Sequence, residues 1–298
     1  MTKSIDKSER KIMEDALFFV AQRGWQTGAD NFFNSLVKFL GESLDMDYVL
    51  VDKLDNNPDI AETVALYAKG SIVPNMRYDL KGTPCENVMG KQLCVYQQEV
   101  QQQFPQDTLL VEMGVEGYIG IPLWDSSGEP IGLIAMLSGK PLPDRTLATQ
   151  VLQLVATRAA AELERERSDR ILRNREHEFR TLAESLPDNI VRYDLEGRAI
   201  YINKMLEKNL GVSAEARLGK RVREFHTDSD FDVYAKAVDE AIASGKNSEF
   251  EIALPVLGKK DSIVQLRVLA ERDEHGVVTG ALAIGRDITE RKQAEQRL

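Results

Sequence analysis

Apolar and polar positions alternate with two different periods along the first half of the chain. Apolar residues recur at helical spacing over residues 8–23 and 29–45, which predicts two amphipathic helices. Short runs of β-branched, aromatic and small apolar residues follow, and we expect strands there, at 48–54, 63–68, 117–124 and 130–137. Residues 70–115 carry scattered Gly and Pro with no clear period, so this stretch is predicted to be irregular.

The second half of the chain repeats this pattern of long strands beside short helices. Strands are predicted at 189–193, 199–202, 247–256, 261–270 and 276–285, and helices near 203–210, 219–225 and 229–244. Turn residues such as Asp194-Leu-Glu-Gly197 separate consecutive strands. The pattern indicates an α+β fold class, with two antiparallel-sheet domains joined by a long helical linker.

One uninterrupted helical pattern joins the halves, from Pro143 to about Leu186. Proline suits the first turn of a helix, and no Gly or Pro follows until Pro187. Opposite charges four residues apart, such as Glu176 and Arg180, support the helix where its pattern is polar. Spacings of three and four residues connect a seam that is apolar at both ends: Leu147, Val151, Leu154, Arg158, Ala161, Arg165, Ser168, Leu172, Arg175, Phe179, Leu182 and Leu186. The seam favours a parallel coiled coil, and so a homodimer through residues 143–186, over a single solvated charged helix.

The last residues change from a strand into a charged helix. Asp287 follows an apolar run and can cap a helix, with Glu290 three residues later completing a capping box. We therefore predict a signal junction at Asp287, Thr289 and Glu290. The segment that follows is polar and too short to be stable alone. We interpret residues 289–298 as the start of an output helix, with residues 287–298 also contributing to the homodimer, upstream of an output domain that this sequence lacks.

Composition and charge narrow the possible classes of function. The chain has 298 residues, with 43% hydrophobic and 29% charged side chains, which suits two soluble globular domains. No apolar run approaches the roughly 20 residues of a membrane span, and no secretory signal is evident. A net charge of -10 disfavours nucleic-acid binding. Two cysteines form no disulfide framework, so a cytoplasmic location is expected.

Several segments of the first half resemble a GAF domain. They are Tyr78-Asp-Leu-Lys-Gly-Thr-Pro-Cys-Glu-Asn-Val-Met-Gly90, Phe104-Pro105, Gly117-Tyr-Ile-Gly-Ile-Pro-Leu and Ile131-Gly-Leu-Ile-Ala. Segments of the second half resemble a PAS domain. They are Phe179-Arg-Thr-Leu-Ala-Glu-Ser-Leu-Pro-Asp-Asn-Ile-Val-Arg-Tyr-Asp194, the Asp-x-x-Gly hairpin, Tyr201-Ile-Asn203 and Gly285-Arg-Asp-Ile-Thr-Glu-Arg291.

These resemblances imply an organisation and a role in signalling. A GAF-like sensory domain is expected over residues 1–145, a helical linker over 146–186 and a PAS-like sensory domain over 187–288. The resemblance implies the sensory region of a bacterial sensor histidine kinase, in a two-component system, or of a diguanylate cyclase type protein. It does not identify a ligand. Because the sequence lacks the kinase histidine box, the nucleotide-binding glycine box and the Gly-Gly-Asp-Glu-Phe motif, no catalytic residue is assigned and the chain is not expected to be an enzyme.

A small-molecule ligand is expected in one or both domains. The residues that we expect to line the first pocket are Tyr78, Cys85, Tyr96, Tyr118 and Trp124, and those for the second are Arg192, Tyr201, Asn203 and His226. His226 could bind haem or sense a proton, but its context resembles an ordinary helix entry. The residues do not support haem, flavin or bilin, so the cofactor is open, and no His, Cys or carboxylate grouping has metal spacing.

Two alternative functions remain open. Cys85 and Cys94 lie in the stretch that covers the pocket of GAF domains, and a GAF-type family of methionine sulfoxide reductases uses cysteines in this region. A thiol oxidoreductase is therefore one alternative, although the sequence shows neither a third cysteine as a resolving partner nor a neighbouring basic residue at helix-start spacing. The other alternative is a dimerisation spacer that binds no ligand.

Overall fold

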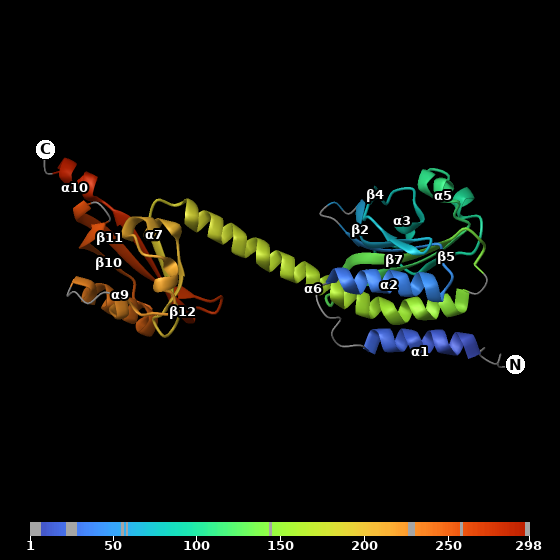
Figure 1. Ribbon diagram of the computed structural model, residues 1–298, viewed down its shortest axis with the longest axis horizontal. Helices are drawn as coiled ribbons and strands as arrows, with labels where there is room; N and C mark the ends of the chain where they lie inside the picture. The colour runs from blue at the N-terminus through green and yellow to red at the C-terminus, as the bar shows by residue number, and fades with distance from the viewer. Residues whose placement is uncertain are drawn as a thin grey trace. The chain divides into compact units, whose positions relative to one another are not determined.

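The computed structural model describes residues 7–21, 29–54, 57, 59–142, 145–225, 230–256 and 259–295. The chain divides into two compact units, Met1–Ile171 and Leu172–Leu298. Each unit contains one antiparallel sheet, and helix α6 (Arg145–Ser185) separates the two sheets along the chain (Figure 1). The predicted α+β fold class is confirmed. Residues 22–23, 143–144, 229 and 296–298 of the predicted elements lie outside the described residues, as does the candidate ligand residue His226.

The N-terminal unit is built on a sheet with the strand order β3-β2-β1-β7-β6-β5, and β4 also pairs with β2. Its strands are β1 (Tyr48–Leu54), β2 (Ile60–Ala68), β3 (Ser71–Val73), β4 (Arg77–Asp79), β5 (Cys94–Tyr96), β6 (Gly117–Trp124) and β7 (Pro130–Ser138). Its helices before α6 are α1 (Lys7–Ala21), α2 (Ala29–Ser43), α3 (Pro84–Val88), α4 (Val100–Gln103) and α5 (Thr108–Met113). The stretch 70–115, predicted to be irregular, holds β3 to β5 and α3 to α5. Each of these is too short to produce a recognisable period.

Alternating side chains of the central strands divide between the two faces of this sheet. Val49, Val51 and Ile119 pack toward α1, α2 and the first half of α6, which lie below the sheet in Figure 1. Leu50 and Tyr118 pack into a second cluster on the opposite face, where α3, α4 and α5 lie. The short helices therefore cover a separate core, and most of the residues expected to bind a ligand in this unit belong to it.

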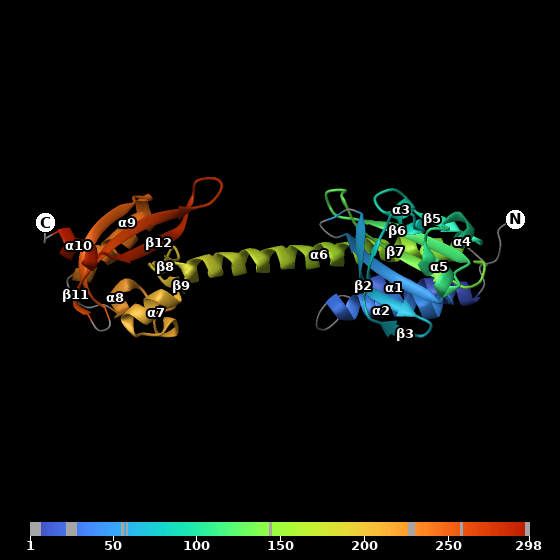
Figure 2. The ribbon, with the colours of Figure 1, turned by 90° about the horizontal axis from the view of Figure 1, so that it is seen from above.

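Helix α6 is one continuous helix (Figure 2), in agreement with its uninterrupted pattern. Up to Leu163 most of its apolar residues are buried or half-buried in the core of the N-terminal unit, whereas Ala161 is exposed. Beyond that point most side chains are exposed, including Leu172. The predicted pair of Glu176 and Arg180 forms, with 3.1 Å between carboxylate and guanidinium. Among the described helices, none is both long and apolar enough to cross a membrane.

The C-terminal unit contains a sheet with the strand order β10-β11-β12-β8-β9. Its strands are β8 (Asn189–Tyr193), β9 (Ala199–Ile202), β10 (Ser248–Val256), β11 (Lys259–Arg272) and β12 (Val278–Asp287). Its helices are α7 (Lys204–Leu210), the 3-10 helix η1 (Ala214–Ala216), α8 (Val222–Phe225), α9 (Asp230–Ser244) and α10 (Thr289–Glu295). Residues of α7, α8 and α9 share one core cluster with the sheet, so this face of the sheet is covered.

Helix α10 begins at the predicted residue 289, but the strand before it, predicted over 276–285, continues two residues further than expected. Asp287 is the last residue of β12 and pairs with Val264 of β11, so the ladder extends the strand up to that point. Helix α10 begins at Thr289, whose backbone N–H donates to the Asp287 carboxylate at 2.9 Å. The carboxylate therefore does satisfy a helix amide, but from a position within the strand.

Candidate functional site

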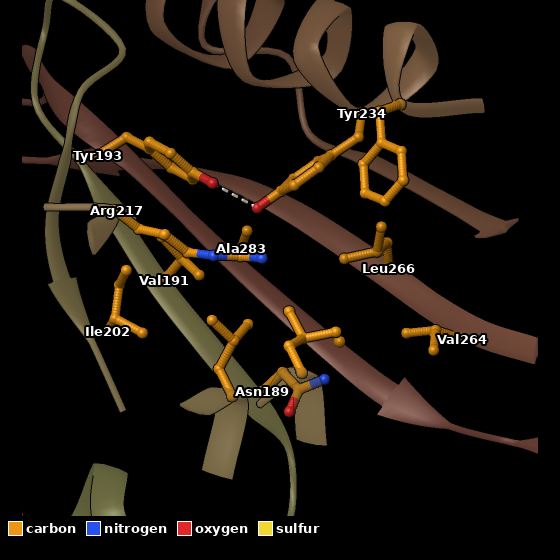
Figure 3. Close-up of a pocket in the computed structure, with 13 residues that line it drawn as sticks. Asn189, Val191, Tyr193, Ile202, Arg217, Tyr234, Val264, Leu266 and Ala283 are labelled. Carbon is orange, nitrogen blue, oxygen red and sulfur yellow. Dashed lines mark hydrogen bonds between the residues drawn. The ribbon is translucent and has the colours of Figure 1, made fainter. Parts of the chain in front are cut away.

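A small cavity lies between the sheet and the helices of the C-terminal unit (Figure 3). Its volume is about 40 Å³. Strands β8, β9, β11 and β12 form one wall, and α7, α9 and the segment after η1 form the other. The residues that line it are Asn189, Val191, Tyr193, Ile202, Leu206, Leu210, Arg217, Phe231, Tyr234, Val264, Leu266, Ala283 and Gly285.

Tyr193, Tyr234 and Arg217 lie together at one end of this cavity, and Asn189 lies toward the other end (Figure 3). The hydroxyl groups of Tyr193 and Tyr234 are hydrogen-bonded at 2.6 Å, and Arg217 extends beneath them toward Ala283. Burial raises the pKa of Tyr234 to about 12 and that of Tyr193 well above its ordinary value, so both are neutral phenols. Arg217 is only 8% exposed, and burial lowers its pKa. Arginine nevertheless stays charged in proteins, so the cavity contains a buried cation.

Arg192 and Tyr201, which were expected in this pocket, are not among its lining residues. Successive strand residues point to opposite faces, and Arg192 lies between the cavity residues Val191 and Tyr193. Arg192 instead donates to Glu271 at 2.9 Å, and its guanidinium lies 5.4 Å from the ring of Phe179 near the end of α6. These groups form a contact between the last turns of α6 and the other face of the sheet.

Tyr201 and Glu184 extend this contact. The ring of Phe179 is 5.5 Å from that of Tyr201, whose hydroxyl donates to Glu184 at 3.1 Å. The other oxygen of Glu184 accepts from the backbone N–H of Lys204 at 2.7 Å. The end of α6 is thus bound to β9 and to the start of α7 through side chains on the face opposite the cavity.

Asn203 is fully buried and joins four backbone groups. Its carbonyl oxygen accepts from Leu206 at 3.2 Å, as the cap of α7, and from Ile190 at 2.9 Å. Its amide donates to the backbone oxygens of Ala183 and Asp188 at 3.0 and 2.9 Å. Asn203 does not line the cavity. An amide suits this position because its oxygen accepts two hydrogen bonds and its nitrogen donates two. The expected ligand contact of His226 lies outside the described residues.

The predicted signal junction is held to the sheet by several contacts. The Thr289 hydroxyl accepts from the backbone N–H of Ile263 at 3.0 Å, and Ile288 donates to the Ile263 carbonyl at 2.9 Å. Lys292 in α10 pairs with Glu251 of β10 at 2.9 Å. Glu290 is exposed. Helix α10 and the residue before it therefore contact β10 and β11, and β11 also lines the cavity.

A second group of buried polar side chains lies in the N-terminal unit, on the face covered by α3 to α5. The Tyr78 hydroxyl donates to the Asp52 carboxylate at 2.5 Å and lies 3.4 Å from the sulfur of Cys85. The Tyr118 hydroxyl approaches the same sulfur at 3.3 Å. Asp52 is 0% exposed, and burial raises its pKa to about 7 against the lowering effect of the Tyr78 hydrogen bond. Its second carboxylate oxygen, Oδ1, has no hydrogen-bond partner among the described residues.

Of the five residues expected in the first pocket, the structure brings four together. Tyr96 joins Tyr78, Cys85 and Tyr118 in the same cluster, and its ring lies 5.9 Å from that of Tyr118. Trp124 lies elsewhere. It is 39% exposed and faces an open groove between the end of β6 and α6. Binding of a ligand by this cluster stays a prediction.

The two thiols are in environments that disfavour the thiolate. Burial, and to a smaller extent the nearby Asp52 charge, raise the pKa of Cys85 to about 12, although the hydrogen bonds from Tyr118 and Tyr78 lower it. Burial also raises the pKa of Cys94, which the Lys91 charge only partly offsets. Because the thiolate is the reactive form, this geometry does not supply an activated nucleophile. Within the described part of the chain, no group of three or more His, Cys, Asp or Glu side chains could hold a metal ion.

Sequence reasoning missed Asp52, Tyr193, Arg217 and Tyr234. Signals in the sequence could have found the first two of these residues. Asp52 interrupts an apolar strand on the same face as Leu50, and Tyr193 lies two positions from Val191 on the inner face of β8. Arg217 and Tyr234 carry no such signal, because a loop and a helix far apart in the sequence bring them to the cavity.

Comparisons with known proteins agree with this architecture in the C-terminal half. The PAS fold family model matches residues 183–293. Two curated relatives are the methyl sulfide methyltransferase-associated sensor of Methanosarcina acetivorans, 24% identical over 63% of this chain, and the methanogenesis regulatory histidine kinase FilI of Methanothrix harundinacea, 27% identical over 40%. The matches span 19% and 13% of those proteins. A solved PAS domain from Colwellia psychrerythraea is 29% identical, with 41% of this chain and 99% of that chain covered and a TM-score of 0.32. The chain is thus distantly related to regions of sensor histidine kinases.

Proposed function

We propose that this chain, whose C-terminal half is a PAS domain, is the sensory segment of a signalling protein of the sensor histidine kinase kind. The PAS cavity binds a small molecule and the sheet transmits its occupancy to α10 and an output domain beyond it. One observation carries the proposal, which is that the cavity and the output helix share a strand. Ala283 and Gly285 of β12 line the cavity, and α10 follows the end of this strand at Thr289.

The residues that follow α6 are bound to the same strand. Arg286 donates to the Asp188 carboxylate through Nε at 2.9 Å and through Nη2 at 2.7 Å. Asn189, the next residue, lines the cavity and pairs with Gly285 in the ladder. An occupant that displaces β12 would therefore move both the start of α10 and residues 188–189, which follow α6.

Transmission of this kind needs two packing arrangements that the occupant distinguishes. A ligand shifts the equilibrium between them only by its difference in affinity for the two. A cavity next to the last residues of a strand suits this mechanism, because a small change in wall position changes the contacts of the occupant and the direction in which α10 leaves the sheet.

The coupling can be tested with a substitution that fills the cavity. A Cβ added at Gly285 would lie 3.2 Å from Val264 and 3.4 Å from Leu266, so Gly285→Ala fits after small shifts of the cavity wall. We expect the NMR amide signals of residues 288–295 to move in this variant. Val277→Ala, at an exposed position beside the other end of β12, is the matched control and should leave them in place. Changes confined to the strands around the cavity would contradict the proposal.

We further propose that the protein is a homodimer through the α6 and α10 regions. Leu172 and Leu182, both 67% exposed, are spaced for a helical seam along the free part of α6. Native mass spectrometry should show a dimer, which Leu172→Glu weakens by about a hundredfold or more because it places two charges in one apolar seam. Asn174→Glu introduces the same charge on another face of the helix and should leave the dimer intact. A wild-type monomer would rule out this assembly.

We propose that the N-terminal unit is a second, GAF-like sensory domain. The buried cluster around Asp52, Tyr78 and Cys85 supports this, because buried polar groups with an unsatisfied oxygen mark functional sites more often than ordinary cores. The Asp52 titration described below tests whether this cluster holds a charge.

A further inference from the structure

The Asp52 carboxyl group is buried in the N-terminal unit with few partners. It is 0% exposed, and its Oδ1 has no hydrogen-bond partner among the described residues. Its Oδ2 accepts from the hydroxyl of Tyr78 in β4 at 2.5 Å. A buried carboxylate needs several donors or a cation, and a single phenol supplies neither. The surroundings therefore suit a neutral carboxyl group.

The titratable groups on this face of the sheet are neutral or acidic. Those around Asp52 are Tyr78 of β4, Cys85 of α3, Tyr118 of β6 and Asp107 at the N-cap of α5. Lys53, the next residue of β1, points to the opposite face and pairs with Glu62 at 3.2 Å. Burial raises the pKa of Asp52 and the Tyr78 hydrogen bond lowers it, and no cation of the described residues contributes.

The ionised form of Asp52 does not suit this packing. A carboxylate with one donor is relieved only when water or a further donor reaches Oδ1, and this requires the chain around it to move. Strand β1 is irregular at this point, because its pairing with β2 shifts register between Val51 and Asp52. A bulge bends a strand and can redirect a side chain. The carboxyl group is therefore carried by the part of β1 that departs from regular pairing.

Gly132 of β7 connects the Asp52 backbone to α6. It lies opposite Lys53 in the ladder, and a Cβ added to it would overlap with the Asp52 carbonyl oxygen and lie 2.8 Å from the Leu163 side chain. Leu163 is buried in the core on the other face of the sheet, and most side chains of α6 beyond it are exposed. A movement at the bulge therefore reaches the last buried turn of α6 through two contacts.

We propose that the N-terminal unit senses protons through Asp52, and that loss of the proton loosens the contact between the sheet and Leu163, where α6 leaves the unit. The neutral carboxyl group favours the packing described above, and the carboxylate favours an arrangement in which Oδ1 is hydrated. A raise of about three pKa units limits the change in the ratio of the two arrangements to about a thousandfold. The inference rests on the proposed sensory role of the N-terminal unit, because it names the signal.

The test is a pH titration of the full chain by NMR, with isotope-labelled leucine methyl groups and backbone amides. We expect the methyl signals of Leu163 and the amide signals of residues 164–168 to move with a midpoint of about pH 7. In Asp52→Asn these signals should stay in place, because the amide cannot titrate. Asp79→Asn removes an exposed carboxyl group from β4 and should titrate like the wild type.

A second variant keeps the carboxyl group and changes its proton affinity. Tyr78→Phe removes the hydrogen bond that lowers the pKa of Asp52, so the midpoint for Leu163 should rise by about one pH unit. Movement of the Leu163 signals that persists in Asp52→Asn would overturn the proposal by assigning it to another group.

A probe on the Asp52 side of the sheet separates titration from transmission. Leu133 pairs with Asp52 and belongs to the core on that face. A response of Leu133 without one of Leu163 would leave a titrating carboxyl group in the cluster but overturn its coupling to α6. The absence of any response at either leucine would overturn proton sensing as a whole. The response of α10 to Gly285→Ala tests the proposed signalling by the PAS domain independently.

Discussion

Replacement of Asp52 by Asn should stabilise the N-terminal domain at alkaline pH, with a gain that disappears as the pH falls. The carboxyl group is fully buried, and its pKa of about 7 lies about three units above the ordinary value of 3.8. One pKa unit corresponds to 1.36 kcal/mol, so ionising the buried group costs about 4 kcal/mol of stability. Asn has the same shape, can accept the Tyr78 hydrogen bond and carries no charge.

The direction of the pH dependence follows from linkage. Below the unfolded pKa of 3.8 the carboxyl is protonated in both states, and its contribution to stability is fully present. Between this value and about 7 the unfolded chain loses its proton while the folded domain retains it, so stability falls as pH rises. Above about 7 both forms are ionised and the loss is complete. The amide of the Asp52→Asn variant cannot titrate, so the variant lacks this decline.

The variant also carries a cost that does not depend on pH. Its Nδ2 replaces Oδ1, which has no partner among the described residues, and an unsatisfied buried donor costs about 1–3 kcal/mol. Because this cost is the same at every pH, it cancels when the relative stability of the variant is compared between two pH values. From about pH 4.5 to about pH 8.5, the stability of the variant relative to wild type should rise by about 3 kcal/mol.

Tryptophan fluorescence during urea unfolding measures this domain separately. The only tryptophans of the chain, Trp25 and Trp124, precede residue 172, so the PAS domain does not contribute to the signal. Asp79→Asn changes an exposed carboxyl on β4 and is the control, with an expected effect within about 0.5 kcal/mol at either pH. A relative stability that changes by less than about 1 kcal/mol between the two pH values would refute the reasoning, because it would show that Asp52 titrates alike in both states.

Three further predictions concern other described groups. Tyr78→Phe removes the hydrogen bond that lowers the pKa of folded Asp52, so the upper end of the pH range over which stability is lost should move to higher pH in the same fluorescence experiment, while its lower end stays at the unfolded pKa. Asn203→Ala removes the cap of α7 and leaves buried backbone groups unpaired, which should destabilise the PAS domain by about 3 kcal/mol or more in calorimetric unfolding. In native protein at neutral pH, alkylation followed by peptide mass spectrometry should label Cys94 before the buried Cys85, and the reverse order would contradict the inert environment assigned to Cys85.

Periodicity predicted the long strands and α6 because each extends over enough residues to repeat its pattern. It failed between residues 70 and 115, where the three-residue strands and short helices obtain their order from packing against the sheet. The end of β12 was misplaced for a related reason. A capping carboxylate resembles a helix start in sequence, and only the pairing of Asp287 with Val264 reveals that the strand continues.

The candidate ligand residues were chosen from the sequence because their side chains are polar. In the structure, the face of the sheet on which each one lies decides whether it can reach a cavity. Arg192 and Tyr201 attracted attention because they are polar residues in strands, but strand alternation directs them away from the cavity. The cluster of Tyr78, Cys85 and Tyr118 was found through its resemblance to a domain family. Its acidic member, Asp52, was not. The inner-face position of Asp52 in an apolar strand marks it as unusual, but only the structure shows that its carboxyl faces a tyrosine from β4.

Strand β8 has a different neighbour on each of its faces. Val191 and Tyr193 touch the cavity, whereas Arg192 between them holds the last turns of α6 through Phe179. Any event upstream that pulls on α6 acts on the strand that shapes the binding wall, and coupling of this kind is reciprocal. Under the proposed function, the PAS domain responds to two inputs, cavity occupancy and events at α6, and a fragment that lacks α6 should have a different ligand affinity from the intact chain.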